Sequence, residues 1–155
     1  MNNRIPYNPS IIEPKWQKKW KDSKIYNVDL DSKNKENIFS LTMFPYPSGD
    51  LHIGHWYAFT PADSYSRFKK MKGFNVLHTQ GFDAFGLPAE NAAISRNINP
   101  MKWTFDNIDN MRGQFNLMGN SYDWSRELIT CTPEYYKWNQ FFFLKMYEKG
   151  IAYRK

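Results

Sequence analysis

The sequence predicts an α/β fold in which parallel strands form a sheet flanked by several helices. Residues 38–44, IFSLTMF, form a short apolar run that is typical of a buried strand. A helical pattern follows from residue 52, and residues 75–78, NVLH, are a second strand candidate. A strand, a helix and a strand in this order predict a right-handed crossover between two parallel strands.

The first part of the chain is predicted to be a helix followed by a polar connection. Ser10 is expected to cap a short helix that carries Trp16 and Trp20 one turn apart. Residues 27–37, NVDLDSKNKEN, are polar and indicate a connecting segment. We therefore expect residues 1–37 to be an N-terminal helix with its connection, and the domain proper to begin at residue 38.

The helix that begins near His52 has one apolar stripe in its sequence. The cationic residues of RFKKMK are expected in the last turn of the helix, where the helix dipole stabilises them. Gly73 is expected to follow the helix as its C-terminal cap. Pro61 lies inside the pattern and is expected to kink the helix, because proline removes a backbone hydrogen bond. The stripe consists of Tyr57, Pro61, Tyr65, Phe68 and Met71.

The rest of the chain is predicted to be mostly helical. Pro88 is expected to start a short helix through residue 95, and Thr104 to cap a longer helix that ends at Gly119. The sequence Thr132-Pro133-Glu134 predicts the start of a last helix that reaches residue 149. Residues 151–155, IAYRK, are expected to open a third strand. The stripe of the longer helix consists of Ile108, Met111, Phe115 and Met118.

The composition favours a soluble protein of the cytoplasm. The chain has 155 residues and is 41% hydrophobic, which is enough for one domain with a core. Cys131 is the single cysteine, so no disulfide can form within the chain. No apolar run approaches the roughly 18 residues of a membrane span, and the N-terminus lacks an apolar signal core. The net charge of +6 favours polyanions such as nucleotides or nucleic acid.

The pair His52 and His55 raises the question of a metal site. A structural zinc site commonly needs four Cys or His ligands. The other candidates, His78 and Cys131, are distant in the sequence and have no paired spacing. We therefore expect no metal bound by the protein. The spacing GDLHIGH also approaches a P-loop, but His55 stands where the lysine is required, and no G-x-G-x-x-G occurs.

The surroundings of the histidine pair indicate a nucleotide site. The pair follows a strand and a Ser-Gly turn and opens a helix, where free backbone N–H groups and the helix dipole attract anions. Gly54 leaves room for a flat ring against the backbone. This predicts an anion joined to a planar base, as in ATP. The alternative, that both histidines merely decorate a helix start, stays open.

A second segment is expected to face the same crevice. Ligands of parallel sheets bind at the carboxyl ends of the strands. The loop after residues 38–44 and the segment GFDAFG, residues 81–86, both follow strands at that edge. Asp83 in the second segment is therefore a candidate ligand-binding residue, or else a residue of a turn.

Three stretches together resemble the leucyl-tRNA synthetases, a family of class I aminoacyl-tRNA synthetases. They are PYPSGDLHIGH at 45–55, GFDAFGLPAENAA at 81–93 and YDWSRELITCTPEYY at 122–136. His52 to His55 match the HIGH signature of class I. The resemblance runs from about Tyr7 to the last residue. It implies the first half of a Rossmann-like, HUP-type parallel-sheet nucleotide-binding fold.

The resemblance also implies roles for individual residues. In this family, leucine reacts with Mg²⁺-bound ATP to give leucyl-adenylate, and the leucyl group then moves to the acceptor end of tRNA-Leu. His52 and His55 would donate hydrogen bonds to the ATP phosphates, Gly54 would pack under adenine, and Asp83 would bind the leucine ammonium. Met43, Phe44 and Tyr46 would line the substrate end, and Glu90 and Asn91 would shape the nucleotide pocket.

Each of these residues also has a structural interpretation. Met43 and Phe44 suit the core of a strand, and Glu90 suits the first turn of a helix. No KMSKS-type loop occurs in the sequence. The resemblance therefore implies that residues 38–155 are the first half of a catalytic domain, ending before the editing insertion and requiring the second half. Pro61 departs from the commoner family pattern.

Two other functions remain open. One is a noncatalytic module that binds adenosine nucleotides or the acceptor end of tRNA. The other is a synthetase for another aliphatic amino acid, although the relatives for valine, isoleucine and methionine usually carry Asn in place of Ser48 and His in place of Phe85.

Overall fold

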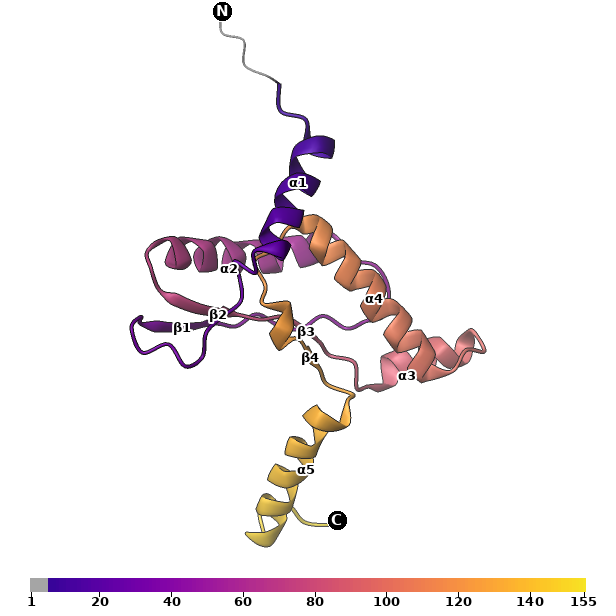
Figure 1. Cartoon of the computed structure of the whole chain (residues 1–155). Coiled ribbons are helices and arrows are strands. Elements are labelled where there is room, and N and C mark those ends of the chain that lie inside the picture. Colours follow the sequence, from indigo (N-terminus) through magenta and orange to yellow (C-terminus); the bar gives the residue numbers. More distant parts are fainter. Residues whose placement is uncertain (1–5) are drawn as a thin grey trace, which may run out of the picture.

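The computed structural model describes residues 6–155 and consists of a small α/β body with two helices that project from it (Figure 1). The start of the predicted N-terminal segment, residues 1–5, lies outside the described residues. The elements in order are α1 (Pro9–Asp22), β1 (Asn37–Ser40), α2 (Ile53–Met71), β2 (Asn75–His78), β3 (Gly81–Phe82), α3 (Leu87–Ser95), α4 (Pro100–Met118), a 3-10 turn (Trp124–Arg126), β4 (Leu128–Ile129) and α5 (Pro133–Glu148).

The predicted crossover between parallel strands is confirmed. Strand β1 pairs in parallel with β2, and Ser40 lies opposite His78 at the carboxyl end of the pair. Helix α2 connects the two strands and packs against β2. The first strand is shorter than the apolar run 38–44 because the chain leaves the ladder after Ser40. Phe39 and Leu41 are exposed, so the prediction of a fully buried strand is wrong.

A second parallel pair of strands forms a separate two-stranded sheet. Strand β3 follows β2 almost directly and pairs with β4, with Gly81 opposite Leu128. A Cβ atom at Gly81 would collide with the Leu128 carbonyl oxygen and come within 3.0 Å of the Phe44 ring. Glycine is therefore required here because two chain segments approach its backbone closely.

The core lies between α2, α4 and the strands β3 and β4. The predicted stripe of α4 is confirmed, because Ile108, Met111 and Phe115 are buried and Met118 packs against their cluster. Gly119 ends α4 in a left-handed conformation with φ of 72°, as predicted. The buried members of the cluster are Phe59, Phe82, Ala84, Ile108, Met111, Phe115 and Tyr122.

The predicted apolar stripe of α2 points away from the core. Phe59, Asp63 and Ser66 are the buried residues of this helix. Aromatic residues occur on several faces of α2, and the buried face places Phe59 in the hydrophobic core and Asp63 in contact with the distant Ser121. Pro61 lies within a helix that continues from Ile53 to Met71, so the proline does not end it. The exposed residues are Tyr57, Pro61, Tyr65, Phe68 and Met71.

Three further predictions need correction. Asn8, not Ser10, caps α1 by accepting the Ser10 N–H. Asn99 caps α4 one turn before Thr104, which is buried inside the helix. Residues 151–155 form no strand in the described structure. In the first two cases a nearby asparagine provided a better acceptor for the orphan N–H groups of the first turn.

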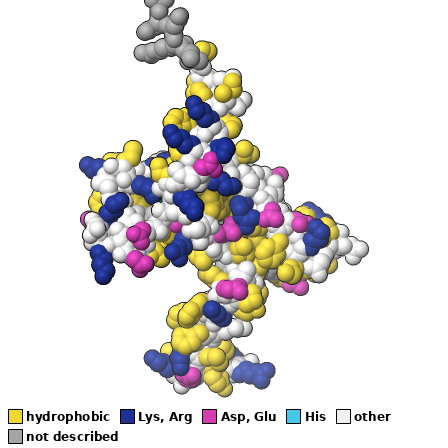
Figure 2. All heavy atoms as spheres, viewed as in Figure 1, with side chains coloured by type: hydrophobic (Ala, Val, Ile, Leu, Met, Phe, Trp, Pro, Cys, Tyr) yellow, Lys and Arg dark blue, Asp and Glu magenta, His cyan; other side chains and the backbone are white. Residues whose placement is uncertain are grey.

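Helix α5 begins at Pro133 after Thr132 and ends at Glu148, as the start and stop signals predicted. It extends away from the body in Figure 1 and has no buried residue. Figure 2 shows hydrophobic side chains gathered over it and around its base. Exposed apolar residues of this helix are Trp138, Phe141, Phe142, Phe143, Leu144, Met146 and Tyr147.

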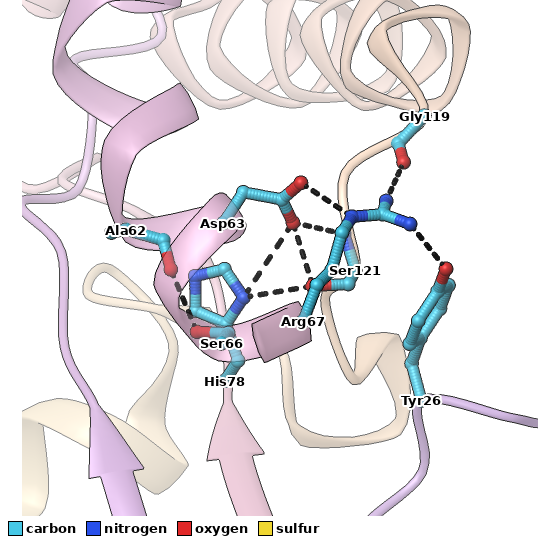
Figure 3. A network of polar contacts seen from close by, with 8 residues as sticks. All are labelled: Tyr26, Ala62, Asp63, Ser66, Arg67, His78, Gly119 and Ser121. Atoms are coloured by element: carbon cyan, nitrogen blue, oxygen red, sulfur yellow. Dashed lines mark hydrogen bonds and ion pairs between the residues drawn. The ribbon is translucent and has the colours of Figure 1, made fainter. Parts of the chain in front are cut away.

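A buried polar network ties α2 to β2 and to the segment after α4 (Figure 3). The Asp63 carboxylate accepts hydrogen bonds from the Ser121 N–H and hydroxyl, at 2.5 and 2.6 Å, and from Arg67 Nε at 2.8 Å. Arg67 also donates to the Tyr26 hydroxyl and the Gly119 carbonyl oxygen. The ion pair is thus hydrogen-bonded on both sides, which is the condition under which buried charges are tolerated.

His78 lies beside this network and is buried. Its Nδ1 atom lies 3.3 Å from the Ser121 hydroxyl and 3.8 Å from the Asp63 carboxylate. Burial lowers the pKa of His78 to about 4, and the nearby Asp63 opposes this only in part. The imidazole is therefore neutral at neutral pH, and its contact with Asp63 is not an ion pair.

No helix among residues 6–155 is both long and apolar enough to cross a membrane.

The burial of His78 predicts that acid destabilises the fold. The unfolded chain protonates this imidazole below about pH 6.5, whereas the folded chain does so only near pH 4. The free energy of unfolding should therefore fall as the pH drops from 7 to 4, by about 3 kcal/mol from this group. Urea unfolding at several pH values measures the slope. His78→Gln should flatten it, and equal slopes in both chains would contradict the assignment. The charged groups nearest the ring are Asp63 and Arg67, with Ser121 and Tyr122 in contact.

The exposed apolar surface predicts that the chain self-associates and is of marginal stability. Two-stranded pairs and an uncovered aromatic helix leave apolar side chains in water, which favours association. Sedimentation velocity should detect oligomers at micromolar concentration, and the double change Phe142→Glu, Phe143→Lys on α5 should reduce them. A wild-type monomer that unfolds in one sharp transition at high temperature would refute this expectation.

Candidate functional site

The two histidines of the HIGH sequence cap the start of α2. His52 is the N-cap residue, and its Nδ1 atom accepts the Gly54 N–H at 3.1 Å. The His55 Nδ1 atom accepts the His52 N–H at 3.1 Å, which completes a reciprocal capping box. The sequence prediction that this pair opens a helix is therefore confirmed, and the role of the pair in binding a ligand stays a prediction.

The capping hydrogen bonds determine which ring nitrogens can act on a ligand. Because both Nδ1 atoms accept a backbone N–H, each neutral ring carries its proton on Nε2. Burial lowers the pKa of His55, and the adjacent His52 lowers it further, so His55 is neutral at neutral pH. The two ring centroids are 4.0 Å apart. Two imidazole rings thus lie next to each other at the positive end of the α2 dipole, each with its Nε2–H group left over from the capping hydrogen bonds.

Gly54 lies directly against the His52 ring. A Cβ atom at Gly54 would lie 2.8 Å from Cε1 and 2.9 Å from Nδ1 of His52. The flat ring that lies against this glycine in the structure is therefore the His52 imidazole. The predicted packing of Gly54 under adenine stays a prediction.

Helix α4 holds the loop before the histidines, a contact that sequence reasoning missed. Gln114 accepts the Leu51 N–H at 2.7 Å and donates to the Asp50 carboxylate at 2.8 Å. Asn110 donates to the same carboxylate at 2.7 Å. These hydrogen bonds, first that of Asn110 and then that of Gln114, lower the pKa of Asp50. No local pattern marks them, because the partners are 60 or more positions apart.

Asp83 lies at the end of β3, beside the loop that follows β1. Its N–H donates to the Pro45 carbonyl oxygen at 2.9 Å, so the PYPSG and GFDAFG segments are neighbours, as the parallel-sheet rule predicted. The Asp83 side chain is half-buried. Its Oδ1 atom lies 3.3 Å from the Thr130 hydroxyl, which comes from the end of β4. Sequence reasoning did not single out Thr130.

The three residues expected to line the substrate end surround this backbone contact. Phe44 is half-buried, and its ring lies near Gly81. Met43 and Tyr46 are 74% and 63% exposed, so the interpretation of Met43 as strand core is wrong. The chain has already left β1 at this point, and the buried Pro45 and Pro47 anchor the segment while the side chains between them face outward.

Glu90 and Asn91 lie on α3 and are exposed. Glu90 borders a cavity of about 500 Å³ whose walls include Phe85, Met101 and Cys131. Neither histidine of the pair nor Asp83 lines this cavity. That the imidazoles and Asp83 share one ligand cavity therefore stays a prediction.

Within residues 6–155, no group of three His, Cys, Asp or Glu residues is arranged to hold a metal ion. Cys131 is a free thiol, and burial raises its pKa.

Comparison with known proteins identifies relatives over almost the whole chain. The chain is 56% identical over 153 residues to a leucine–tRNA ligase of Rubrobacter xylanophilus, covering 99% of this chain and 19% of that protein. It is 59% identical over 148 residues to a leucine–tRNA ligase of Dehalococcoides mccartyi, covering 96% of this chain and 18% of that protein. The chain thus spans about a fifth of the length of these relatives.

Solved structures agree with the fold. A LeuRS of Agrobacterium radiobacter, solved as a ternary complex with tRNA and LeuAMS, superposes with a TM-score of 0.90 at 41% identity, covering 97% of this chain and 19% of that one. A methionyl-tRNA synthetase of Mycobacterium tuberculosis superposes with a TM-score of 0.69 at 23% identity, covering 74% of this chain and 22% of that one, which supports the Rossmann-like fold. The model of the class I tRNA synthetases for isoleucine, leucine, methionine and valine matches residues 15–155, and the chain therefore belongs to this family.

Proposed function

We propose that this chain is the ATP- and leucine-binding part of a leucine–tRNA ligase. The single observation that carries the proposal is the capping box of His52 and His55, which occupies both Nδ1 atoms and leaves both Nε2–H groups without a hydrogen bond within residues 6–155, at a helix N-terminus. The high identity to leucine–tRNA ligases supports leucine as the amino acid. In the first reaction, the leucine carboxylate attacks the α-phosphate of ATP, leucyl-adenylate forms and pyrophosphate leaves.

The histidine pair stabilises the negative charge that develops on the phosphate oxygens. A neutral imidazole whose Nδ1 accepts a backbone N–H can only donate through Nε2. Both rings therefore offer hydrogen-bond donors to the negatively charged phosphate oxygens. The free N–H groups of the first turn of α2 add to the attraction. Because the reaction forms no covalent enzyme intermediate, the protein contributes position and charge stabilisation. Mg²⁺ accompanies ATP as part of the substrate.

Asp83 binds the ammonium group of leucine in this proposal. Its carboxylate attracts the amino end and repels the carboxylate end, which turns the reacting group toward the phosphates. Met43, Phe44 and Tyr46 provide the apolar surface for the substrate, and Glu90 and Asn91 border the nucleotide. The protein acts in the cytoplasm, and the leucyl group passes to the acceptor end of tRNA-Leu. The second half of the synthetase, after the domain that begins at residue 38, completes the site.

A noncatalytic module that binds nucleotides or tRNA is the competing function. The exposed lysines of α1 favour it, since they form a basic surface at one end of the molecule (Figure 2). Such a module binds no amino acid and therefore does not depend on the Asp83 carboxylate. Binding of ATP or tRNA that is indifferent to Asp83→Ala would therefore favour the module over the ligase.

The ligase function predicts leucine-dependent exchange of pyrophosphate into ATP. The assay is run with the chain alone and with the remainder of the longer protein supplied. His52→Asn is the informative variant, because asparagine keeps a good N-cap acceptor but lacks the Nε2–H donor of histidine. It should lower the exchange rate about 10²-fold while the helix content is kept.

Competition among leucine, isoleucine, valine and methionine in the same assay tests the choice of amino acid. If neither the chain nor the combination exchanges or binds leucine and ATP, the proposed function is wrong.

The contact of α4 with the histidine loop predicts a remote effect on nucleotide binding. Gln114→Ala removes the acceptor for the Leu51 N–H and one donor to Asp50, so the start of α2 should lose its fixed position. ATP affinity should fall about five- to tenfold, the equivalent of the ~1 kcal/mol that one hydrogen bond contributes. Isothermal titration calorimetry with Mg²⁺-bound ATP measures the change.

Asn116→Ala on the exposed face of the same helix is the matched control and should bind ATP as the wild type does. Equal affinities in all three chains would exclude a role for this contact.

A further inference from the structure

Thr130 occupies an unusual place between the end of β4 and the loop that carries Asp83. Its hydroxyl oxygen accepts the Ala84 N–H at 2.8 Å and the Phe85 N–H at 3.2 Å. The same oxygen lies 3.3 Å from Oδ1 of Asp83. The backbone of Thr130 is itself fixed, because its N–H donates to the Phe82 carbonyl oxygen at 3.2 Å.

The hydrogen-bonding capacity of a hydroxyl group determines the direction of the contact with Asp83. A threonine hydroxyl has one hydrogen to donate and two lone pairs to accept. The N–H groups of Ala84 and Phe85 occupy both lone pairs. The one hydrogen is left for the Asp83 carboxylate, which can only accept. The contact is thus forced to run from Thr130 to Asp83.

This arrangement leaves one carboxylate oxygen of Asp83 for another partner. Oδ1 receives the Thr130 hydrogen, whereas no hydrogen bond within residues 6–155 engages Oδ2. The Asp83 backbone is held separately by the Pro45 carbonyl oxygen at 2.9 Å. With its backbone and one oxygen fixed, the carboxylate has a defined plane.

We propose that Thr130 is a positioning residue that orients the Asp83 carboxylate so that Oδ2 faces the ammonium group of the amino acid. The inference rests on the proposed function. Thr130 does not touch the substrate and acts through Asp83. A carboxylate that is already oriented binds a cation without the entropic cost of fixing its side chain. Thr130 therefore contributes to the recognition of the amino group and leaves recognition of the leucine side chain unchanged.

A loss of stability cannot test this role. Thr130→Val would leave the Ala84 and Phe85 N–H groups without their acceptor, which destabilises the loop whether or not Thr130 orients Asp83. The useful readout is one that depends on the ammonium group of the ligand. A non-hydrolysable leucyl-adenylate analogue and its counterpart without the amino group provide it, since the two ligands differ only in that group.

The experiment measures the ratio of the two affinities by calorimetry for each variant of the full chain. The wild type should prefer the ligand with the amino group. Thr130→Val should reduce this preference about tenfold by weakening the amino ligand alone, and Thr130→Ser, which keeps the hydroxyl, should restore it. Thr132→Val is the matched control, because its hydroxyl donates to the Ile129 carbonyl oxygen at 3.0 Å and not to Asp83.

The outcomes separate the two proposals. A wild-type chain without preference for the amino ligand overturns the proposed function, and this inference falls with it. A wild-type preference that is unchanged in Thr130→Val overturns the role of Thr130 alone. If the valine variant does not fold, Thr130→Cys takes its place, because a thiol in the position of the hydroxyl donates only weakly. A cysteine variant with the wild-type ratio again excludes the role.

Discussion

The first turn of α2 is the constraint on which the candidate site depends. The orphan N–H groups of a helix start need acceptors, and here two imidazoles provide them instead of the usual hydroxyl or carboxylate side chains. A hydroxyl cap would satisfy the helix equally well, but it would present no rigid donor on its far side. A neutral imidazole has an acceptor nitrogen and a donor nitrogen in one ring, so one group can cap the helix start and still donate a hydrogen bond elsewhere. If a ring is doubly protonated, its Nδ1 atom carries a hydrogen and can no longer accept the backbone N–H, so the capping hydrogen bond is lost.

Helix α4 connects this turn to the other half of the candidate site. In its second half, Gln114 holds the loop before His52, while the adjacent Phe115 is fully buried in the core. Two residues earlier, Arg112 binds both carboxylate oxygens of Glu127 at 2.8 and 2.9 Å, directly before β4. A single packed helix therefore positions both the loop before His52 and the strand β4, which Thr130 follows. A bidentate pair of this kind fixes direction as well as distance.

Features with a local cause could be predicted from the sequence. The capping role of the histidines, the start of α5 at Pro133 and the glycine end of α4 each depend on neighbouring residues. The nearness of Asp83 to the PYPSG loop followed from a general rule on parallel sheets. The buried face of α2 could not be predicted, because aromatic residues surround that helix and the contacts of Asp63 with Ser121 select the face. Gln114 and Thr130 were missed for the same reason: each acts on a partner that is distant in the chain.

The apolar residues around Asp83 are exposed, but their backbone is not free to move. Between the buried Pro45 and Pro47, the Tyr46 side chain faces outward, and the Pro45 carbonyl oxygen is already bonded to Asp83. On the other side, Phe85 is exposed and its ring lies 5.7 Å from that of Tyr136. An exposed aromatic surface on a fixed backbone loses little conformational entropy when an apolar group covers it. The burial of that surface then contributes about 25 cal/mol per Å² to binding. The exposure from which we predict self-association is thus the same property on which the proposed binding of an aliphatic amino acid depends.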